Sequence, residues 1–253
     1  NVDGIITKSP EIEYLRKIFK IKVPTILFQD YCLDELIVNR RTRKISQKDG
    51  EFHLVYVGGV MPMSYPKRLC GGTQFLDIAK ILASQGIHFH IYPSPYHKRS
   101  YPEYRKFMKA TQYFHLHKPM SIRKLPKEIA RYDYGLYLVD YRNAPAVTDV
   151  KRKTGTGNKF ATYLEAGLPT IVNPELEYES KRIGRANVGL VVGVEDLSKL
   201  ASILQSVNYE ELIKNIKTKR RTFNMAKRIT RLETFYKRVI RYNKTVRGIN
   251  ETN

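Results

Sequence analysis

The chain has 253 residues, of which 42% are hydrophobic and 11% are aromatic. This composition can supply a core and excludes a wholly disordered chain, and no apolar run reaches the roughly 20 residues that a membrane-spanning helix needs. The formal net charge of +21 favours an anionic partner, whether nucleic acid, anionic lipid or a phosphorylated small molecule.

The first predicted elements form a strand–helix–strand unit. Residues 4–7 and 25–28 are β-prone, and a helix is expected between them from Ser9, its N-cap, to about residue 20. One such unit cannot bury both faces of its own strands, so it requires a sheet to join. We therefore interpret residues 1–50 as the last unit of an incomplete N-terminal domain, ending in a polar, basic linker at 39–50.

Residues 51–196 alternate short apolar strands with helices, as in a doubly wound, parallel, Rossmann-like α/β sheet. Strands are expected at 54–57, 88–92, 113–117, 134–139, 170–172 and 189–192. Helices are expected at 72–85, 103–110, 122–131, 159–166 and 175–185. Ligands of this fold bind at the carboxyl ends of the strands, so the loops there are the candidate site.

The first candidate loop follows the strand at 54–57. Gly58 and Gly59 would let the backbone approach a phosphate, and Lys67 and Arg68 would neutralise a diphosphate. The pattern is not G-x-G-x-x-G, so the dinucleotide fingerprint is absent. An ordinary strand–helix turn with surface bases remains the alternative.

The second candidate loop runs from residue 140 to 158 and opens directly into a helix. Its small residues would expose backbone N–H groups to a phosphate, beside a lysine at the helix start. The helix ends at Gly167, and Pro169 directs the chain into the next strand. The predicted donor-binding residues of this segment are Thr154, Gly155, Thr156, Gly157, Asn158, Lys159 and Thr162.

The run GNKFATYLEAGLPTIV at 157–172 resembles the signature of group-1-type nucleotide-sugar glycosyltransferases with the GT-B fold. The resemblance extends over about residues 52–195, and residues 2–38 resemble the end of that family's N-terminal domain. It implies a GT-B C-terminal domain with a partial N-terminal domain. The matching positions in the signature are Asn158, Lys159, Tyr163, Gly167, Pro169 and Ile171.

The chain departs from the family at two glutamates that bracket the loop in many members. Thr154 and Thr162 occupy those positions, and Glu165 lies on a different part of the helix. Thr162 retains a hydroxyl that can form hydrogen bonds, with shorter reach and no charge. The resemblance places acceptor-side groups in the N-terminal domain, so no catalytic residue is assigned here, and this chain by itself is expected to bind nucleotide rather than to complete a transfer.

The resemblance implies an enzyme that transfers a hexose from a nucleoside-diphosphate sugar, with retention, in cell-surface glycan or glycolipid synthesis. No cofactor and no essential metal are expected, and the partners would be the donor and a glycan or lipid-linked acceptor. Residues 197–253 are expected to be basic helices that pack back toward the N-terminal domain. Their exposed basic face would suit peripheral contact with an anionic membrane. We expect a cytoplasmic protein, peripheral at the inner face of the membrane, in which Cys32 and Cys70 are reduced.

Three alternatives compete with this interpretation. The net charge of +21 would suit a nucleic-acid-binding or scaffolding α/β protein, although no stacking platform or reading motif accompanies it and nucleic acid is the less favoured partner. A sugar-nucleotide epimerase or a phosphorylase could use the same two-domain fold. The pairs His88/His90 and His115/His117 would each project to one sheet face, where core or edge histidines are favoured over a metal site.

Overall fold

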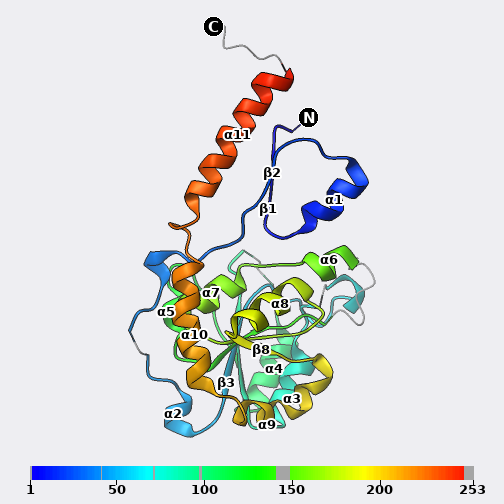
Figure 1. Cartoon of the computed structure of the whole chain (residues 1–253). Helices are drawn as coiled ribbons and strands as arrows, with labels where there is room; N and C mark the ends of the chain where they lie inside the picture. Colours follow the sequence, from blue (N-terminus) through cyan, green and yellow to red (C-terminus); the bar gives the residue numbers. More distant parts are fainter. Residues whose placement is uncertain (1, 41, 71, 97–98, 141–148, 248–253) are drawn as a thin grey trace.

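The computed structural model describes residues 2–40, 42–70, 72–96, 99–140 and 149–247. Its centre is a sheet of six parallel strands in the order β5-β4-β3-β6-β7-β8 (Figure 1). The first and fourth strands of the domain lie side by side in the middle, which confirms the predicted doubly wound α/β class. The strands are β3 (His53–Gly58), β4 (His88–Pro93), β5 (Phe114–Leu116), β6 (Tyr134–Tyr137), β7 (Thr170–Val172) and β8 (Gly189–Val191).

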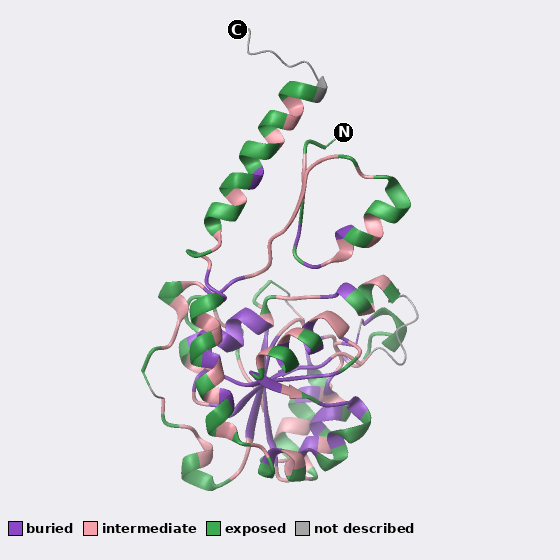
Figure 2. Ribbon diagram, in the orientation of Figure 1, coloured by how far each residue is buried: buried purple, intermediate pink, exposed green. Residues whose placement is uncertain are grey.

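Helices cover both faces of this sheet, so its strands are buried along almost their whole length (Figure 2). One face packs against α3, α4, η3 and α9, and the other against α5, α7, α8 and α10. Burial on both sides explains the apolar sequences of β6 and β7, whereas β3, β4 and β5 also carry histidines. The bounds are η2 (Lys67–Leu69), α3 (Leu76–Ala83), α4 (Pro102–Ala110), α5 (Leu125–Ile129), α6 (Asp149–Thr154), α7 (Lys159–Ala166), α8 (Glu177–Ala186), η3 (Val194–Lys199), α9 (Leu200–Gln205) and α10 (Tyr209–Thr222).

The second candidate loop is shorter than predicted. The helix and the strand that follow it begin and end where the sequence predicted, but part of the loop itself is helical. The helix at 159–166 and the strand at 170–172 are found where they were predicted, and Gly167 ends α7 at φ 74°. Residues Asp149–Thr154, however, form helix α6 where a loop was expected. Residues 141–148 of that loop, and Gly71 near the first candidate loop, lie outside the described residues. The glycine-rich turn is therefore confined to residues 155–158.

The basic segment expected to be a linker packs against the Rossmann-like domain. Helix η1 (Asp34–Leu36) lies just before this segment, and α2 (Ser46–Asp49) lies near its end. Lys44 Nζ donates hydrogen bonds to the carbonyl oxygens of Ala130 and Tyr132, at 2.9 and 2.6 Å. Its polar composition thus provides contacts to the domain as well as solubility.

The N-terminal unit consists of the parallel pair β1 (Ile5–Thr7) and β2 (Thr25–Leu27), joined by α1 (Glu11–Phe19). Pro10 takes the N-cap position that Ser9 was expected to hold. The last helix, α11 (Ile229–Arg247), runs alongside this unit (Figure 1), with Phe235 buried and Arg238 Nη2 donating to the carbonyl of Thr25 at 2.6 Å. None of the helices in the described ranges combines the length and hydropathy that a membrane crossing requires.

Two chain segments connect the N-terminal unit and α11 to the Rossmann-like domain, and they lie side by side. Cys32 N donates to Phe223 O at 3.0 Å, and Met225 N donates to Cys32 O at 2.9 Å. The rings of Tyr31 and Phe223 also pack, with centroids 4.8 Å apart. These contacts place the N-terminal unit over the carboxyl edge of the large sheet, beside the predicted site (Figure 1).

Candidate functional site

The candidate site lies where the carboxyl ends of β3 and β6 meet in the centre of the sheet. From β3 the chain continues to β4 on one side, whereas β6 leads to β7 on the other, so this is the topological switch point at which doubly wound folds bind ligands. Gly58 ends β3 with φ 132°, a conformation that side chains of L-residues rarely adopt. The first candidate loop therefore leaves the sheet at the position that the sequence predicted.

The glycine-rich turn before α7 packs closely on its neighbours. A Cβ at Gly155 would lie 2.5 Å from Lys151 O, and a Cβ at Gly157 would lie 3.0 Å from the hydroxyl of Tyr137 at the end of β6. The first backbone bond of α7 runs from Thr162 N to Asn158 O at 3.1 Å. The amides that precede residue 162 lack intrahelical acceptors, as at any helix start, and form an anion-binding end.

Lys159 is the central cation of the site. Its Nζ lies 5.1 Å from the ring centroid of Tyr56 and 5.2 Å from that of Tyr137, on the two central strands. The same atom would lie 3.1 Å from a Cβ at Gly58, so the ammonium covers the end of β3. Within the described residues no carboxylate neutralises it, and burial lowers the pKa of Lys159 to about 8. A desolvated, unpaired cation at a switch point is typical of a functional site.

The threonines of the predicted donor-binding set use their hydroxyls within the protein. Thr154 Oγ1 donates to Val150 O at 2.7 Å, and Thr162 Oγ1 donates to Asn158 O at 3.1 Å. Both side chains are buried, and each hydroxyl keeps its acceptor lone pairs. Glu165 is turned away from the turn: its Oε1 accepts from Leu33 N at 2.9 Å, and burial raises its pKa to about 7.

Glu179 of α8, which the sequence analysis did not identify, holds the glycine-rich turn through a hydrogen bond to Thr156. Its carboxylate is completely buried, accepts a hydrogen bond from the hydroxyl of Thr156, and pairs with Arg182 Nη1 at 3.1 Å. Arg182 stacks on the rings of Phe160 and Phe223, each 4.8 Å away. Spacing of three residues on a helix predicts the ion pair, but only the fold shows that it is buried beneath the turn.

The first predicted basic pair lies on the surface. Lys67 and Arg68 belong to η2, and both are exposed. Lys67 Nζ pairs with Asp77 of α3 at 3.1 Å. Arg99, which follows β4, instead contacts the first candidate loop, since its Nη1 donates to Val60 O at 3.1 Å. Of the predicted bases, Lys159 alone is thus placed between the two central strands.

The N-terminal unit borders the turn from the other side. Lys8 Nζ contacts Asp30 Oδ1 at 2.9 Å and Asn158 Oδ1 at 3.4 Å. Gln29 Nε2 donates to the hydroxyl of Tyr178 on α8. The glycine-rich turn therefore faces the boundary between the N-terminal unit and the Rossmann-like domain rather than bulk surface.

Histidines form a second titratable cluster, on the face of β3, β4 and β5 that α5 covers. His53 Nδ1 lies 2.9 Å from His90 Nε2, His90 Nδ1 lies 3.0 Å from His117 Nε2, and His88 Nδ1 lies 3.0 Å from His115 Nε2. The terminal Nε2 atoms of His53 and His88 face Asp49 and Glu51, at 3.0 and 2.6 Å. When every ring is neutral and carries its proton on Nε2, each Nε2–H donates to the Nδ1 of the next ring or to the carboxylate at the end of the row. Both rows of histidines are then fully hydrogen-bonded.

Among the described residues, Asp49, His53 and His88 have ligand atoms within 4.8 Å of one another, the spacing of a metal site. The rings of His53 and His88, however, stack in parallel, with an interplanar angle of 1° and centroids 4.3 Å apart. Stacked rings hold their in-plane lone pairs in two parallel planes, whereas a tetrahedral Zn²⁺ needs the lone pairs to converge on one point. The hydrogen-bonded array therefore fits a structural role in the sheet better than coordination.

We expect the histidine array to make the stability of the fold sensitive to acid. Burial, together with the neighbouring charges, lowers the pKa of His115 and of His117 to about 4 from 6.5. Between these values the unfolded chain binds protons that the folded chain does not, so stability is expected to fall as the pH drops from about 6.5 to 4 and to stay level above 6.5. Urea unfolding at pH 7.5, 6 and 5 measures the slope. In His115→Gln the slope should be shallower, and an unchanged slope would contradict the assignment.

The fold and the turn define the class: a GT-B-type Rossmann domain whose glycine-rich turn and lysine meet at the switch point. Residues 89–241 match the protein family described as "Glucosyltransferase 3-like, C-terminal domain", and the chain belongs to this family. Comparison with curated proteins gives no match.

Solved structures share the fold at low sequence identity. The pneumococcal O-GlcNAc transferase GtfA, solved with UDP and GlcNAc, matches at TM-score 0.60 and 16% identity over 99% of this chain and 46% of its own. Sucrose-phosphate synthase from Thermosynechococcus elongatus matches at TM-score 0.61 and 15% identity, over 96% of this chain and 59% of its own. WaaG, a glycosyltransferase of lipopolysaccharide biosynthesis, matches at TM-score 0.55 and 16% identity, over 86% and 58%. This chain thus spans about half the length of these proteins.

Proposed function

We propose that this chain is the donor-binding part of a glycosyltransferase that moves a sugar from a nucleoside-diphosphate sugar to an acceptor in cell-surface glycan or glycolipid synthesis. The observation that carries the proposal is Lys159, whose ammonium is held between the ends of β3 and β6 at the start of α7 and has no carboxylate partner in the described part of the chain. Family membership and the UDP complex of GtfA support a nucleotide-sugar ligand.

The chemical task of this site is to stabilise the diphosphate as it leaves the sugar. The leaving group gains negative charge in the transition state, and preorganised donors in a partly desolvated site are the strongest source of such stabilisation. Lys159 would supply the positive charge, and the free amides at the start of α7 would supply further donors. Gly59, where no atom lies within 4 Å of a Cβ position, would let the diphosphate approach the backbone.

Several finer points belong to the proposal. The proposed reaction is hexosyl transfer with retention, which the resemblance of residues 157–172 to the family signature implies, and donor binding with Lys159 and amides would assign no essential role to a metal. The side chains of Lys237, Arg241 and Lys244 on α11 are exposed, which supports peripheral contact with an anionic membrane. The proposed location is the cytoplasm, at the inner face of the membrane and close to a lipid-linked acceptor.

Thermal unfolding in the presence of UDP-, GDP-, ADP- and CMP-sugars tests the donor class. A ligand at a hundred times its Kd stabilises the native state by about 2.7 kcal/mol, which corresponds to a rise of roughly 5 to 10 °C in Tm for a chain of this size. We expect one base to give this shift and the other bases to give less. No shift with any of them, together with tight and salt-sensitive binding of RNA or DNA, would favour the nucleic-acid alternative instead.

A further inference from the structure

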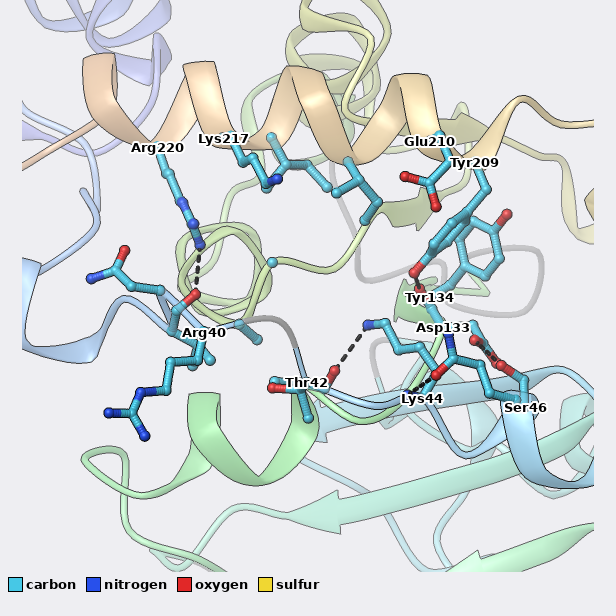
Figure 3. A pocket seen from close by; sticks show the side chains of 18 of the residues that line it. Arg40, Thr42, Lys44, Ser46, Asp133, Tyr134, Tyr209, Glu210, Lys217 and Arg220 are labelled. Carbon is cyan, nitrogen blue, oxygen red and sulfur yellow. Dashed lines mark hydrogen bonds between the residues drawn. The ribbon is translucent and has the colours of Figure 1, made fainter.

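A cavity of about 440 Å³ lies at the edge of the sheet opposite the donor turn, between helix α10 and the segments at 38–40 and 42–47 (Figure 3). Phe52, just before β3, and Tyr134, the first residue of β6, line it, so it sits at the amino ends of the strands whose carboxyl ends meet at Lys159. Its size lies within the range of small-molecule sites. It is thus separate from the proposed donor site by the length of the sheet.

Positive charge dominates one part of this cavity. Arg40, Lys44, Lys217 and Arg220 line it, against the acidic residues Asp133 and Glu210. The Asp133 carboxylate is already occupied, because it accepts from Ser46 Oγ at 2.5 Å and from His53 N at 2.8 Å. In Figure 3, Arg40, Lys217 and Arg220 lie toward one end, and Tyr134, Tyr209 and Asp133 toward the other.

The two partly buried cations keep unused donors. Lys44 Nζ gives two hydrogen bonds to carbonyl oxygens of the α5–β6 connection, and an ammonium has three donors. Arg220 Nη1 donates to Val38 O at 3.0 Å, which uses one of five guanidinium donors. The Asp133 carboxylate interacts electrostatically with the Lys44 ammonium, whereas the partner of Arg220 is an uncharged carbonyl. An anion in the cavity would therefore complete the electrostatics and the hydrogen bonding of Arg220.

The rest of the lining is apolar or aromatic. Ile213 and Ile216 of α10 and Ala166 of α7 contribute aliphatic surface, and Tyr134 and Tyr209 pack edge to face with centroids 5.4 Å apart. We propose that this cavity binds an organic anion, with its single acidic group among Arg40, Lys217 and Arg220 and its apolar or aromatic body over α10 and the two tyrosines. Because Ala166 ends the helix that Lys159 begins, such a ligand touches the far end of the donor-binding helix.

Fluorescence titration with 8-anilino-1-naphthalenesulfonate tests this proposal, since the probe carries one anionic group on an aromatic body. Lys217 is exposed, and Lys217→Ala is expected to weaken the binding of the probe about fivefold, the upper end for an exposed charged contact. The matched control is Lys214→Ala, an exposed lysine of the same helix that does not line the cavity. The uncharged analogue N-phenyl-1-naphthylamine should respond to neither variant, because it offers no anionic group.

Two further variants locate the probe. Lys159→Ala, at the donor turn, and Ile240→Ser, on the exposed face of α11, should leave the affinity for the sulfonate unchanged. Loss of binding in either variant would put the probe at the donor turn or on the apolar surface of α11 and would overturn the proposal. Equal affinity in the wild type and in Lys217→Ala would overturn it as well. Circular dichroism establishes that each variant is folded.

Discussion

Replacement of Lys159 by alanine is expected to weaken the binding of the preferred nucleoside diphosphate by roughly ten- to a hundredfold, the worth of a hydrogen bond from a charged group. The expectation rests on the position of the ammonium between Tyr56 and Tyr137, beside the amides of α7 and without a carboxylate partner among the described residues. Isothermal calorimetry with the nucleotide identified by the thermal panel measures the change directly.

Lys153→Ala is the matched control, because this exposed lysine lies in the last turn of α6, just before the glycine-rich turn. Its loss should change the affinity by less than about fivefold. The pKa of about 8 adds a second readout: the ammonium is charged below this value, so affinity should decline as the pH rises through 8 in the wild type and not in Lys159→Ala. An affinity unchanged by Lys159→Ala would remove the main support for donor binding at this turn.

Replacement of Glu179 by alanine is expected to destabilise the fold by about 3 kcal/mol, because it leaves the Arg182 guanidinium without its partner in a largely buried place. The same change releases the hydroxyl of Thr156 and with it the glycine-rich turn. Urea unfolding measures the stability, and nucleotide binding to the folded fraction should weaken in parallel.

Helix α8 offers its own control for this prediction. Glu177 pairs with Lys181 at 3.1 Å on the same helix, but with exposed fractions of 41% and 62%, so Glu177→Ala should cost roughly 0.5 kcal/mol or less. The double variant Glu179→Leu with Arg182→Met should recover much of the stability, since apolar residues replace a buried ion pair at little cost. Nucleotide binding should stay weak in that variant, because the turn still lacks its carboxylate. Recovery of full affinity would show that Glu179 serves the fold alone.

The bounds of α7 and β7 could be predicted from local sequence because clear start and stop residues flank them. Small residues precede the helix, Gly167 ends it at φ 74°, and Pro169 prevents its continuation. Helix α6 was missed because its short sequence, DVKRKT, offers little apolar periodicity, and helices of this length depend on contacts made after folding. Those contacts come from α1 and α8.

Part of the candidate site could be predicted from local sequence, and the rest depended on tertiary structure. The glycines at 58, 155 and 157 and the lysine at 159 were identifiable, because close backbone approach and a charged helix start leave a direct mark on residue type. The surface position of Lys67, the local hydrogen bonds of Thr154 and Thr162, and the support from Glu179 were not. These depend on which residues far apart in the chain become neighbours.

By itself, the sequence determined the α/β alternation, the parallel sheet and the turn that precedes α7, since hydrophobic period and glycine–proline punctuation act over a few residues. Tertiary structure alone decided which cation stands unpaired at the switch point, how five histidines align across β3, β4 and β5, and that the basic segment at 38–47 encloses a cavity with α10. The physical reason is that burial and pairing energies arise between distant segments, and sheet order and helix packing create those neighbours.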